Sequence, residues 1–429
     1  MKIIDIIDQF ISGEWGEEKY SDSTPYKVAC IRGADISPID NGDFTHIPTR
    51  YISKRSFEGK RLQAGDIVVE KSGGSPTQST GRVAFISQNL IDSVGSVVCS
   101  NFCVAFRVTK NWNPLYIFYY LQFIYNKGVF FNFEGKTSGL KNLQLEAAYK
   151  AIPIKDIDEV HQAQIVAILD SIHRKLTINR AINQNLEALA KQLYDYWFVQ
   201  FDFPDENGRP YKSSGGAMVW DEKLKREIPE GWSVSKVEEI AQTYSGGTPN
   251  STNEDYYKNG TIPWINSGEL NNPIITSTSN YITKLGLDNS SAKLYPINTI
   301  LVALYGATAG KVSLLTFSAC SNQAICGVIP SKRFLVIYLY FALSSMYERF
   351  VTLSTGSARD NISQATVKIT QVIVPTSAIL AKFDNIANGI IQDIVNNQRG
   401  NESLIKKREE LLPLLMNGQV SLNSDLSLD

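Results

Sequence analysis

The 429-residue sequence contains few of the residues that carry catalysis, metal binding or disulfide bonding. Its three histidines are scattered, and its five cysteines do not follow a common zinc-binding spacing. An odd number of cysteines also argues against a secreted disulfide framework. We therefore expect buried, reduced cysteines with a structural role, no metal site, and little material for acid–base chemistry.

The sequence also lacks long apolar segments. No stretch approaches the ~18 consecutive apolar residues of a membrane-spanning helix. Acidic residues at Asp5 and Asp8 fall where a signal peptide would have its apolar run, so we expect a cytoplasmic protein. The apolar content of 43% and charged content of 20% are typical of globular proteins. The length favours two or three globular units.

An excess of positive charge, which is typical of nucleic-acid-binding proteins, is absent, because the net charge is −1. The charge is unevenly distributed, however. Residues 1–155 have 18 basic and 15 acidic side chains, and residues 206–375 have 15 and 13. The remaining segments are net acidic. This distribution fits a chain that shares DNA binding with partners better than one that grips phosphates alone.

An internal repeat is the most informative feature of the sequence. Six short segments of the first half recur in the same order in the second half, at separations of 233 or 234 residues for the first three and then falling to 219. The pairs are Ser12-Gly13 and Ser245-Gly246, Ile31–Ile36 and Ile265–Leu270, Asp66–Val69 and Thr299–Val302, Gly81–Val83 and Gly310–Val312, Cys99–Asn101 and Cys320–Asn322, and Asn142-Leu143 and Asn361-Ile362. The chain is therefore predicted to be a duplication with longer loops in its first copy.

Each copy has the same predicted order of elements. Apolar, β-branched runs at 66–70, 83–87 and 97–108 predict strands. Aromatic-rich helices are predicted at about 114–127 and 333–350, and the apolar period then changes from two residues to about 3.6.

Long helices are therefore predicted at 158–197 and 378–415. A helix of about 36 residues would be roughly 54 Å long, so its apolar stripe needs a partner, and the simplest partner is the other helix. The stripe positions are Ile165, Leu169, Ile172, Leu176, Ile182, Leu186, Leu189 and Leu193 in the first helix, and Phe383, Ile386, Ile390, Ile394, Leu404, Leu411 and Leu415 in the second. Asn179, Asn183, Asn397 and Asn401 interrupt the stripe and could fix the register. A structural spacer role accounts for most of this pattern.

Several strings resemble the specificity subunit of type I restriction-modification systems, and the resemblance covers nearly the whole chain. They are Pro229-Glu230-Gly231-Trp232 leading to Ser245–Pro249, Tyr305–Val312, Leu189–Val199 and Leu411–Gly418. The resemblance implies two target-recognition domains that each read one half of a bipartite DNA site, and an antiparallel coiled coil that sets the gap between half-sites. It also implies that this chain is non-catalytic. Two methyltransferase subunits would dock on it and restriction subunits could then join, with S-adenosylmethionine, ATP and Mg bound by those partners. The first copy departs from the pattern, because Gly13–Gly16 replaces the Pro-x-Gly-Trp lead-in and the Gly73–Gly81 loop is longer.

We accordingly expect an α+β protein with two pseudo-symmetric target-recognition domains separated by a pair of long antiparallel coiled-coil helices. The expected divisions are residues 1–155 and 203–376 for the recognition domains, 156–202 and 377–420 for the helical spacers, and 421–429 for a tail.

Three motifs that could indicate catalysis are incomplete. Gly306–Lys311 has three residues between its glycines and is followed by Val312, whereas a phosphate-binding loop needs four residues and a Ser or Thr. A tight turn is the better interpretation, either purely structural or with Thr308 and Lys311 facing DNA. Asn113–Tyr116 lacks the second proline of an amino-methyltransferase loop, and Glu17–Lys19 lacks the context of a nuclease core.

DNA reading requires forked hydrogen bonds to base edges and anchors on phosphates. Polar loops of both copies supply such residues, although each one could equally be a solvated loop residue. The candidates are Arg32, Ser72, Gln78, Thr80, Arg82, Lys136, Lys141 and Asn142 in the first copy, and Thr248, Asn266, Tyr305, Thr308, Lys311, Arg359 and Asn361 in the second.

An aromatic cluster at the end of the first long helix, Tyr194, Tyr196, Trp197 and Phe198, could either pack into the adjoining domain or dock a methyltransferase subunit. Two other functions remain open on the sequence. One is a self-sufficient DNA-modifying enzyme, which would need a cofactor loop. The other is a coiled-coil adaptor that binds only proteins.

Overall fold

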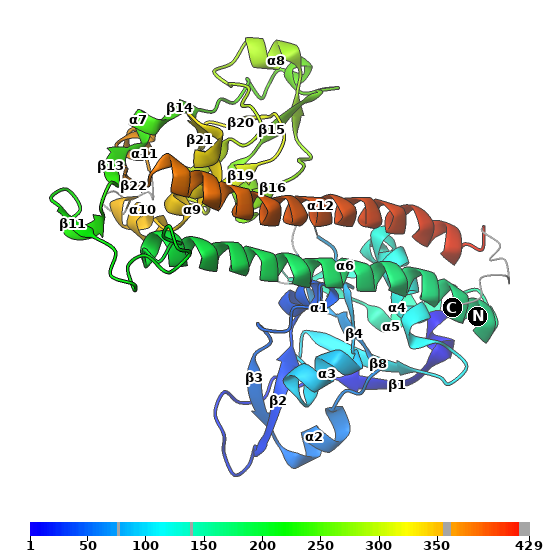
Figure 1. Ribbon diagram of the computed structural model, residues 1–429. Helices are drawn as coiled ribbons and strands as arrows, with labels where there is room; N and C mark the ends of the chain where they lie inside the picture. The colour runs from blue at the N-terminus through cyan, green and yellow to red at the C-terminus, as the bar shows by residue number, and fades with distance from the viewer. Residues whose placement is uncertain (75–77, 138–139, 355–361, 420–429) are drawn as a thin grey trace. The chain divides into compact units, whose positions relative to one another are not determined.

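The computed structural model describes residues 1–74, 78–137, 140–354 and 362–419 (Figure 1). Its contacts divide into two compact units. Unit 1 comprises residues 1–178 and the chain from residue 401, and unit 2 comprises residues 179–400. Both units combine mostly antiparallel sheets with helices, as the sequence predicted. None of the helices within the described ranges is long and apolar enough to cross a membrane.

Unit 1 is built around a four-stranded antiparallel sheet in the order β1-β8-β4-β6. Its strands are β1 (Ile7–Ser12), β4 (Ile67–Glu70), β6 (Val83–Phe85) and β8 (Cys103–Val108). The central strand β4 has three consecutive β-branched residues, Ile67, Val68 and Val69, and all three are fully buried. Such a short continuous apolar run is typical of a strand that is covered on both faces.

Two smaller sheets and several helices complete unit 1. The sheets are β3-β2-β7, formed by β2 (Tyr26–Ile31), β3 (Thr49–Ile52) and β7 (Val97–Cys99), and β5-β10-β9, formed by β5 (Ser72–Gly73), β9 (Glu134–Thr137) and β10 (Leu140–Leu143). The helices are α1 (Ile36–Asp40), α2 (Lys54–Lys60), α3 (Gln88–Val94), α4 (Pro114–Asn126) and α5 (Leu145–Ala151), with 3₁₀ turns η1 (Ile3–Ile6), η2 (Gly33–Asp35) and η3 (Val129–Phe133). The aromatic helix α4 begins at Pro114, where the sequence predicted a helix, and the Asn113 side chain caps it by accepting from the Leu115 amide at 3.0 Å.

Unit 2 repeats this plan around the sheet β14-β21-β18-β19-β16. Its strands are β14 (Ala241–Ser245), β16 (Ile274–Ile275), β18 (Ile300–Ala303), β19 (Val312–Leu315) and β21 (Ile325–Pro330). The smaller sheets are β17-β15-β20, with β15 (Ile262–Ile265), β17 (Tyr281–Ile282) and β20 (Cys320–Ser321), and the pairs β11 (Met218–Asp221) with β12 (Arg226–Pro229) and β13 (Ser233–Lys236) with β22 (Gln371–Val374). The shorter helices are α7 (Val237–Ile240), α8 (Lys284–Asp288), α9 (Val336–Ser344), α10 (Tyr347–Ser354) and α11 (Gln364–Ile369), with η4 (Asp195–Val199), η5 (Glu254–Tyr256), η6 (Ser267–Asn271) and η7 (Arg333–Leu335).

The strand registers confirm the internal repeat. Ser12 pairs with Val104 in unit 1, and Ser245 pairs with Cys326 in unit 2. Across the next strand, Val69 also pairs with Val104, as Val302 pairs with Cys326. The two units therefore share one backbone framework, and positions can be matched between them by register.

The register corrects the sequence analysis in the segment 97–108, which was predicted as one strand. It is two strands in different sheets, because a turn at Ser100 (Cys103 amide to Ser100 carbonyl, 2.9 Å) breaks the run between β7 and β8. The match between Cys99 and Cys320 was also wrong by one residue. The Glu14 amide donates to the Cys99 carbonyl in unit 1, whereas the equivalent Gly247 amide donates to the Ser321 carbonyl. The helix predicted at 333–350 is likewise divided, into α9 and α10.

The two long helices are α6 (Glu159–Tyr194) and α12 (Ser377–Met416), and each contributes to both units. In unit 2 they run antiparallel, since Asn183 contacts Asn397 while Tyr194 contacts Phe383 (Figure 1). In unit 1, Ile165 and Leu169 of α6 share a buried core with Leu412 and Leu415 of α12.

The stripe of these helices is buried or half-buried at most of the predicted positions, but three of them are exposed. Ile182 and Leu189 of α6 are 41% and 51% exposed, and Ile386 of α12 is 47% exposed. Asn183, Ala190 and Tyr194 are buried in place of the first two. A strict seven-residue pattern drifts by about 20° per heptad around a straight helix, so the apolar spacing alone misplaces single positions such as these three.

Candidate nucleic-acid interface

Two of the predicted DNA-binding arginines are paired with buried carboxylates of unit 1. Arg82 Nε and Nη2 donate to the Glu70 carboxylate at 2.9 and 2.7 Å, and Arg32 Nε and Nη2 donate to Asp35 at the same two distances. The hydrogen bonds that they donate to these carboxylates raise the pKa of both guanidinium groups. The Arg82 fork faces inward and its side chain is 20% exposed, whereas Arg32 remains 39% exposed. Arg32 is therefore the better placed of the two to meet a ligand.

The sheet β5-β10-β9 brings several predicted residues together at one edge of unit 1. Ser72 on β5 donates to the Asn142 side chain on β10 at 2.5 Å. Lys141, the neighbour of Asn142, lies opposite Lys136 of β9 in the strand register. The Lys141 ammonium lies 3.5 Å from Glu134 and donates to the Gln78 carbonyl at 3.1 Å.

Thr80 and Gln78 occupy different environments beside this sheet. Thr80 is fully buried, and its amide and hydroxyl both donate to Glu134, at 2.7 and 3.1 Å. Its role is therefore to hold the loop after Ser79 against β9. The Gln78 side chain is exposed and can contact a ligand.

The turn after β18 carries the corresponding residues of unit 2. Gly306 and Gly310 have φ angles of +85° and +82°, which glycine adopts without strain, and the Lys311 amide returns to the Thr308 carbonyl at 2.9 Å. Thr308 is buried and Tyr305 half-buried. Lys311 Nζ donates to Asn271 at 2.5 Å. The structure thus supports the tight-turn interpretation and leaves Lys311 and Tyr305 partly accessible.

Thr248 and Asn266 lie near the same end of the unit 2 framework. The hydroxyl of the exposed residue Thr248 donates to the Gln323 side chain. The side-chain amide nitrogen of Asn322, next to Gln323, lies 3.5 Å from the side-chain oxygen of Asn266. The two other candidates of this copy, Arg359 and Asn361, lie outside the described residues.

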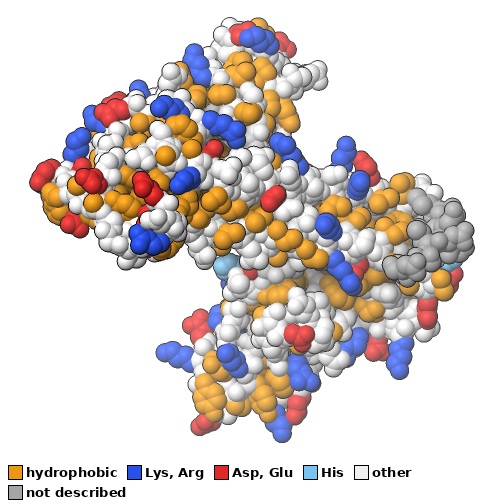
Figure 2. Space-filling model, in the orientation of Figure 1, with side chains coloured by type: hydrophobic (Ala, Val, Ile, Leu, Met, Phe, Trp, Pro, Cys, Tyr) orange, Lys and Arg blue, Asp and Glu red, His pale blue; other side chains and the backbone are white. Residues whose placement is uncertain are grey.

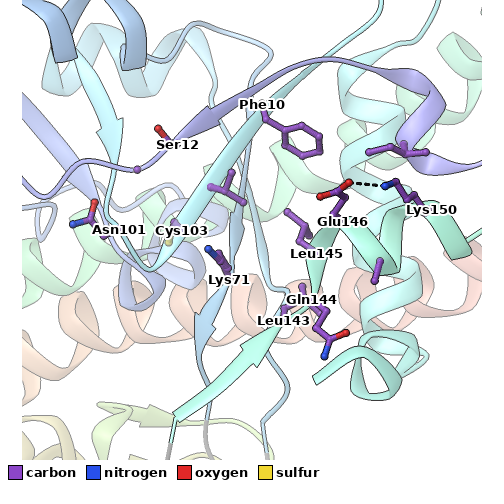
Figure 3. A pocket seen from close by; sticks show the side chains of 14 residues that line it. Phe10, Ser12, Lys71, Asn101, Cys103, Leu143, Gln144, Leu145, Glu146 and Lys150 are labelled. Atoms are coloured by element: carbon purple, nitrogen blue, oxygen red, sulfur yellow. Dashed lines mark hydrogen bonds and ion pairs between the residues drawn. The ribbon is translucent and has the colours of Figure 1, made fainter. Parts of the chain in front are cut away.

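Beside strand β1, unit 1 has a groove of about 990 Å³ (Figure 3). Phe10 and Ser12 line it from β1, Asn101 and Cys103 lie on the same side of the view as Ser12, and Lys71 lies beside Cys103. The Lys71 side chain is exposed. An ion pair between Glu146 and Lys150 (2.6 Å) closes the margin formed by α5. The groove therefore joins exposed apolar surface to a cation and to amide groups.

The surface charge is mixed. On the face shown in Figure 2, Lys and Arg side chains alternate with Asp and Glu side chains instead of forming one positive field. Nor do the described residues contain a group of three His, Cys, Asp or Glu side chains that could hold a metal ion.

A family comparison identifies this framework. The model for the type I restriction modification DNA specificity domain matches residues 39–188 and again residues 229–397. The chain belongs to this family. The two matches fall in the two copies of the repeat, and together they cover most of the chain.

The chain is also similar to proteins that are named specificity subunits of type I restriction enzymes. The chain is 24% identical over 438 residues to the type I restriction enzyme MjaIX specificity subunit of Methanocaldococcus jannaschii, covering 96% of this chain and 94% of that protein. It is 26% identical over 314 residues to the HindI specificity subunit of Haemophilus influenzae, covering 61% and 68%. The crystal structure of a type I restriction-modification S subunit from M. genitalium has the same fold, with a TM-score of 0.55 at 13% identity over 97% of this chain and 95% of that chain.

In this family member the proposed docking cluster at the end of α6 is mostly internal. Tyr194, Trp197 and Phe198 are about 5% exposed and belong to the core of unit 2, where the Phe198 ring lies 4.8 Å from the Phe383 ring. These three side chains therefore pack into the adjoining domain, which was one of the two interpretations that the sequence left open. Tyr196 is 39% exposed and remains available for a partner.

Sequence reasoning missed three accessible residues of unit 1, namely Trp15, Lys71 and Phe102. Trp15 follows β1, and Phe102 lies in the turn between β7 and β8 with 54% of its surface exposed. The signal for Phe102 was an apolar residue within a polar turn, but the segment was predicted as a continuous strand. Gly13 supplied a further signal, because a Cβ there would lie 2.0 Å from the Ser100 carbonyl oxygen. This close approach fixes the Trp15 loop against the Phe102 turn.

Proposed function

We propose that this chain selects a bipartite DNA target, with unit 1 reading one half-site and unit 2 the other. The most direct support is that the two units have the same backbone framework but different side chains at equivalent positions. Arg32 and Asn266 follow the equivalent strands β2 and β15, and Ser72 and Tyr305 follow β4 and β18 at equivalent positions. One framework with different hydrogen-bonding groups at the same positions is suited to reading two different sequences.

The chemical steps of modification and cleavage belong, in this proposal, to partner subunits. Two methyltransferase subunits would bind the chain, and restriction subunits could join them. S-adenosylmethionine, ATP and Mg would be bound by these partners, and the complex would act in the cytoplasm. The alternatives of a self-sufficient enzyme and of an adaptor that binds only proteins are not favoured by the family match.

An exposed apolar stripe on α6 supports a partner-docking surface. Ile182, Leu189 and Tyr196 are 41%, 51% and 39% exposed and are spaced seven residues apart. Seven residues correspond to about two helical turns, so the Ile182 and Leu189 side chains lie on one face of α6 with Tyr196 following in the next turn. We propose that a methyltransferase subunit covers this stripe.

The DNA-reading proposal is tested with the chain assembled with its methyltransferase subunits. Sequencing of methylated sites on random-sequence DNA should yield a two-part motif. Arg32→Ala should relax the motif in one half-site, and Lys311→Ala should weaken binding or relax the other half-site, each by roughly 5- to 150-fold when a base contact is lost. Lys175→Ala on the exposed face of α6 is the control and should leave both half-sites unchanged. Tight binding of the assembled complex without sequence preference would contradict the proposal.

A further inference from the structure

Unit 1 contains a second pocket, of about 560 Å³, that differs in character from the groove beside β1. It is lined by Trp15, Arg32, Glu70, Ser100, Asn101 and Phe102, with Gly33, Ala34, Ser72 and Gly73 between them. Its volume lies within the ~300–1,000 Å³ of small-molecule sites, which combine apolar walls with a few placed polar groups.

Two aromatic rings at this pocket are exposed rather than packed into a core. Trp15 is 36% exposed and Phe102 54% exposed. The Arg50 guanidinium lies over the Trp15 ring, 4.3 Å from its centroid, and so restrains the orientation of the indole. Exposed aromatic surface held in place in this way is suited to stacking with a planar ligand.

The polar part of the pocket is built around the Glu70 carboxylate, which is 2% exposed. A Cβ at Gly33 would lie 2.6 Å from Glu70 Oε1, and one at Gly73 would lie 2.9 Å from it. Glycines at these two positions therefore give the backbone room beside the carboxylate. Although Arg82 donates to both Glu70 oxygens, each carboxylate oxygen can accept a further hydrogen bond.

The equivalent positions in unit 2 do not provide an aromatic pair. By register, Trp15 corresponds to Thr248, Asn101 to Gln323 and Phe102 to Ala324. The Thr248 hydroxyl donates to Gln323, and Ala324 is buried. Gly246 approaches the Asn322 carbonyl as Gly13 approaches the Ser100 carbonyl, each with a hypothetical Cβ at 2.0 Å, so the backbone is the same and the pocket is a property of the unit 1 side chains.

We propose that this pocket binds an unstacked nucleobase of the target DNA, which stacks on Trp15 and Phe102 while its exocyclic amino group donates to Glu70. Adenine, cytosine and guanine carry such a group, at N6, N4 and N2 respectively, whereas thymine does not, so we expect the pocket to reject thymine. This inference rests on the proposed function, since it assigns the DNA contact of unit 1. The two units would then recognise DNA differently: unit 1 by binding an unstacked base, and unit 2 by contacting the edges of stacked bases.

The test uses the chain assembled with its methyltransferase subunits and duplexes in which 2-aminopurine is placed beside each base of the unit 1 half-site in turn, so that the captured base keeps its own amino group. Unstacking should raise the fluorescence at one position on binding. Trp15→Ala and Phe102→Ala should abolish this rise and weaken specific binding by roughly 5- to 150-fold, as expected for loss of base–aromatic stacking. Tyr20→Ala removes a ring that is 62% exposed outside the pocket and should change neither readout.

Unchanged fluorescence at every position, with normal sequence-specific binding, would overturn the pocket assignment and leave the proposed function intact. Loss of all sequence preference in the parent complex would instead contradict the proposed function. A third arm titrates adenosine monophosphate in the absence of DNA. Saturable binding that Trp15→Ala abolishes, together with unchanged fluorescence on DNA, would show that the pocket takes a free nucleotide instead, and would overturn the DNA assignment.

Discussion

Asn397 donates a hydrogen bond from Nδ2 to the side-chain oxygen of Asn183 at 2.9 Å, between the two helices of unit 2. Asn183 is 6% exposed and in turn donates to the Ile394 carbonyl at 3.3 Å. This buried amide pair is satisfied only when these two residues face each other. It therefore favours one register of the helices, as polar residues in coiled-coil seams commonly do.

Replacing only one member of the pair should be costly. In Asn397→Leu the buried Asn183 oxygen loses its donor, and we expect the free energy of unfolding to fall by about 1–3 kcal/mol. The double variant Asn183→Leu/Asn397→Leu should recover most of this loss, because neither unpaired group remains. Urea denaturation followed by tryptophan fluorescence measures both variants. A single variant as stable as the parent would contradict the role of the pair.

The close contact at Gly13 yields a prediction about the framework. Gly13→Ala would place a Cβ 2.0 Å from the Ser100 carbonyl oxygen, so the backbone must shift, and we expect a loss of about 1–3 kcal/mol in unfolding free energy. Gly246→Ala should have a similar effect in unit 2. The matched control is Gly59→Ala in α2, where no atom lies within 4 Å of the added Cβ and a gain of up to about 1 kcal/mol is expected.

The exposed stripe on α6 predicts a loss of partner binding without a loss of folding. Leu189→Asp should weaken association with methyltransferase subunits by roughly 10- to 150-fold, if docking buries the whole side chain. Circular dichroism and the unfolding midpoint should not change, because Leu189 is 51% exposed in the chain. Val160→Asp, at a residue 66% exposed near the start of α6, is the control for a new charge on the same helix. Equal association of both variants would exclude Leu189 from the interface.

The cysteines predict how stability depends on pH. All five are buried and free, and burial raises the pKa of the Cys30, Cys103, Cys320 and Cys326 thiols to about 12. In the unfolded chain these thiols ionise near pH ~8.5, so from there upwards the unfolded state binds fewer protons than the native state. The unfolding free energy should therefore fall as pH rises above ~8.5. Native protein should also resist labelling by a disulfide reagent at pH 8, and rapid labelling without unfolding would contradict this.

The parts of the fold that were predictable depend on local patterns. The apolar side chains of runs such as Ile67–Val69 are enough to predict buried strands. The repeat strengthened this prediction, because the same pattern occurs in both copies. The ends of α6 and α12 followed from the change in apolar period. The buried side of α6 near Leu189 did not, because it is set by accumulated helical rotation and by the partner helix.

The candidate site was less predictable, because the roles of its residues depend on partners that are distant in sequence. Arg82 and Arg32 look alike as loop arginines, yet one guanidinium is turned inward to Glu70 and the other is accessible. The Thr80 amide donates a hydrogen bond to Glu134, which is 54 residues away in the sequence. Trp15 could not be recognised as a pocket residue until Gly13 and the Ser100 turn were placed together.

The contribution of α12 to unit 1 has a consequence for how the chain is made. Unit 2 is continuous in sequence, so it can fold as soon as it leaves the ribosome. Unit 1 emerges first, but its core includes Leu412, Leu415 and Met416. Its early-synthesised apolar surface must therefore stay uncovered until the last helix is translated. A ribosome that stalls before residue 401 would leave a chain in which unit 2 can fold but the core of unit 1 stays exposed. Chaperones and proteases would recognise this exposed apolar surface.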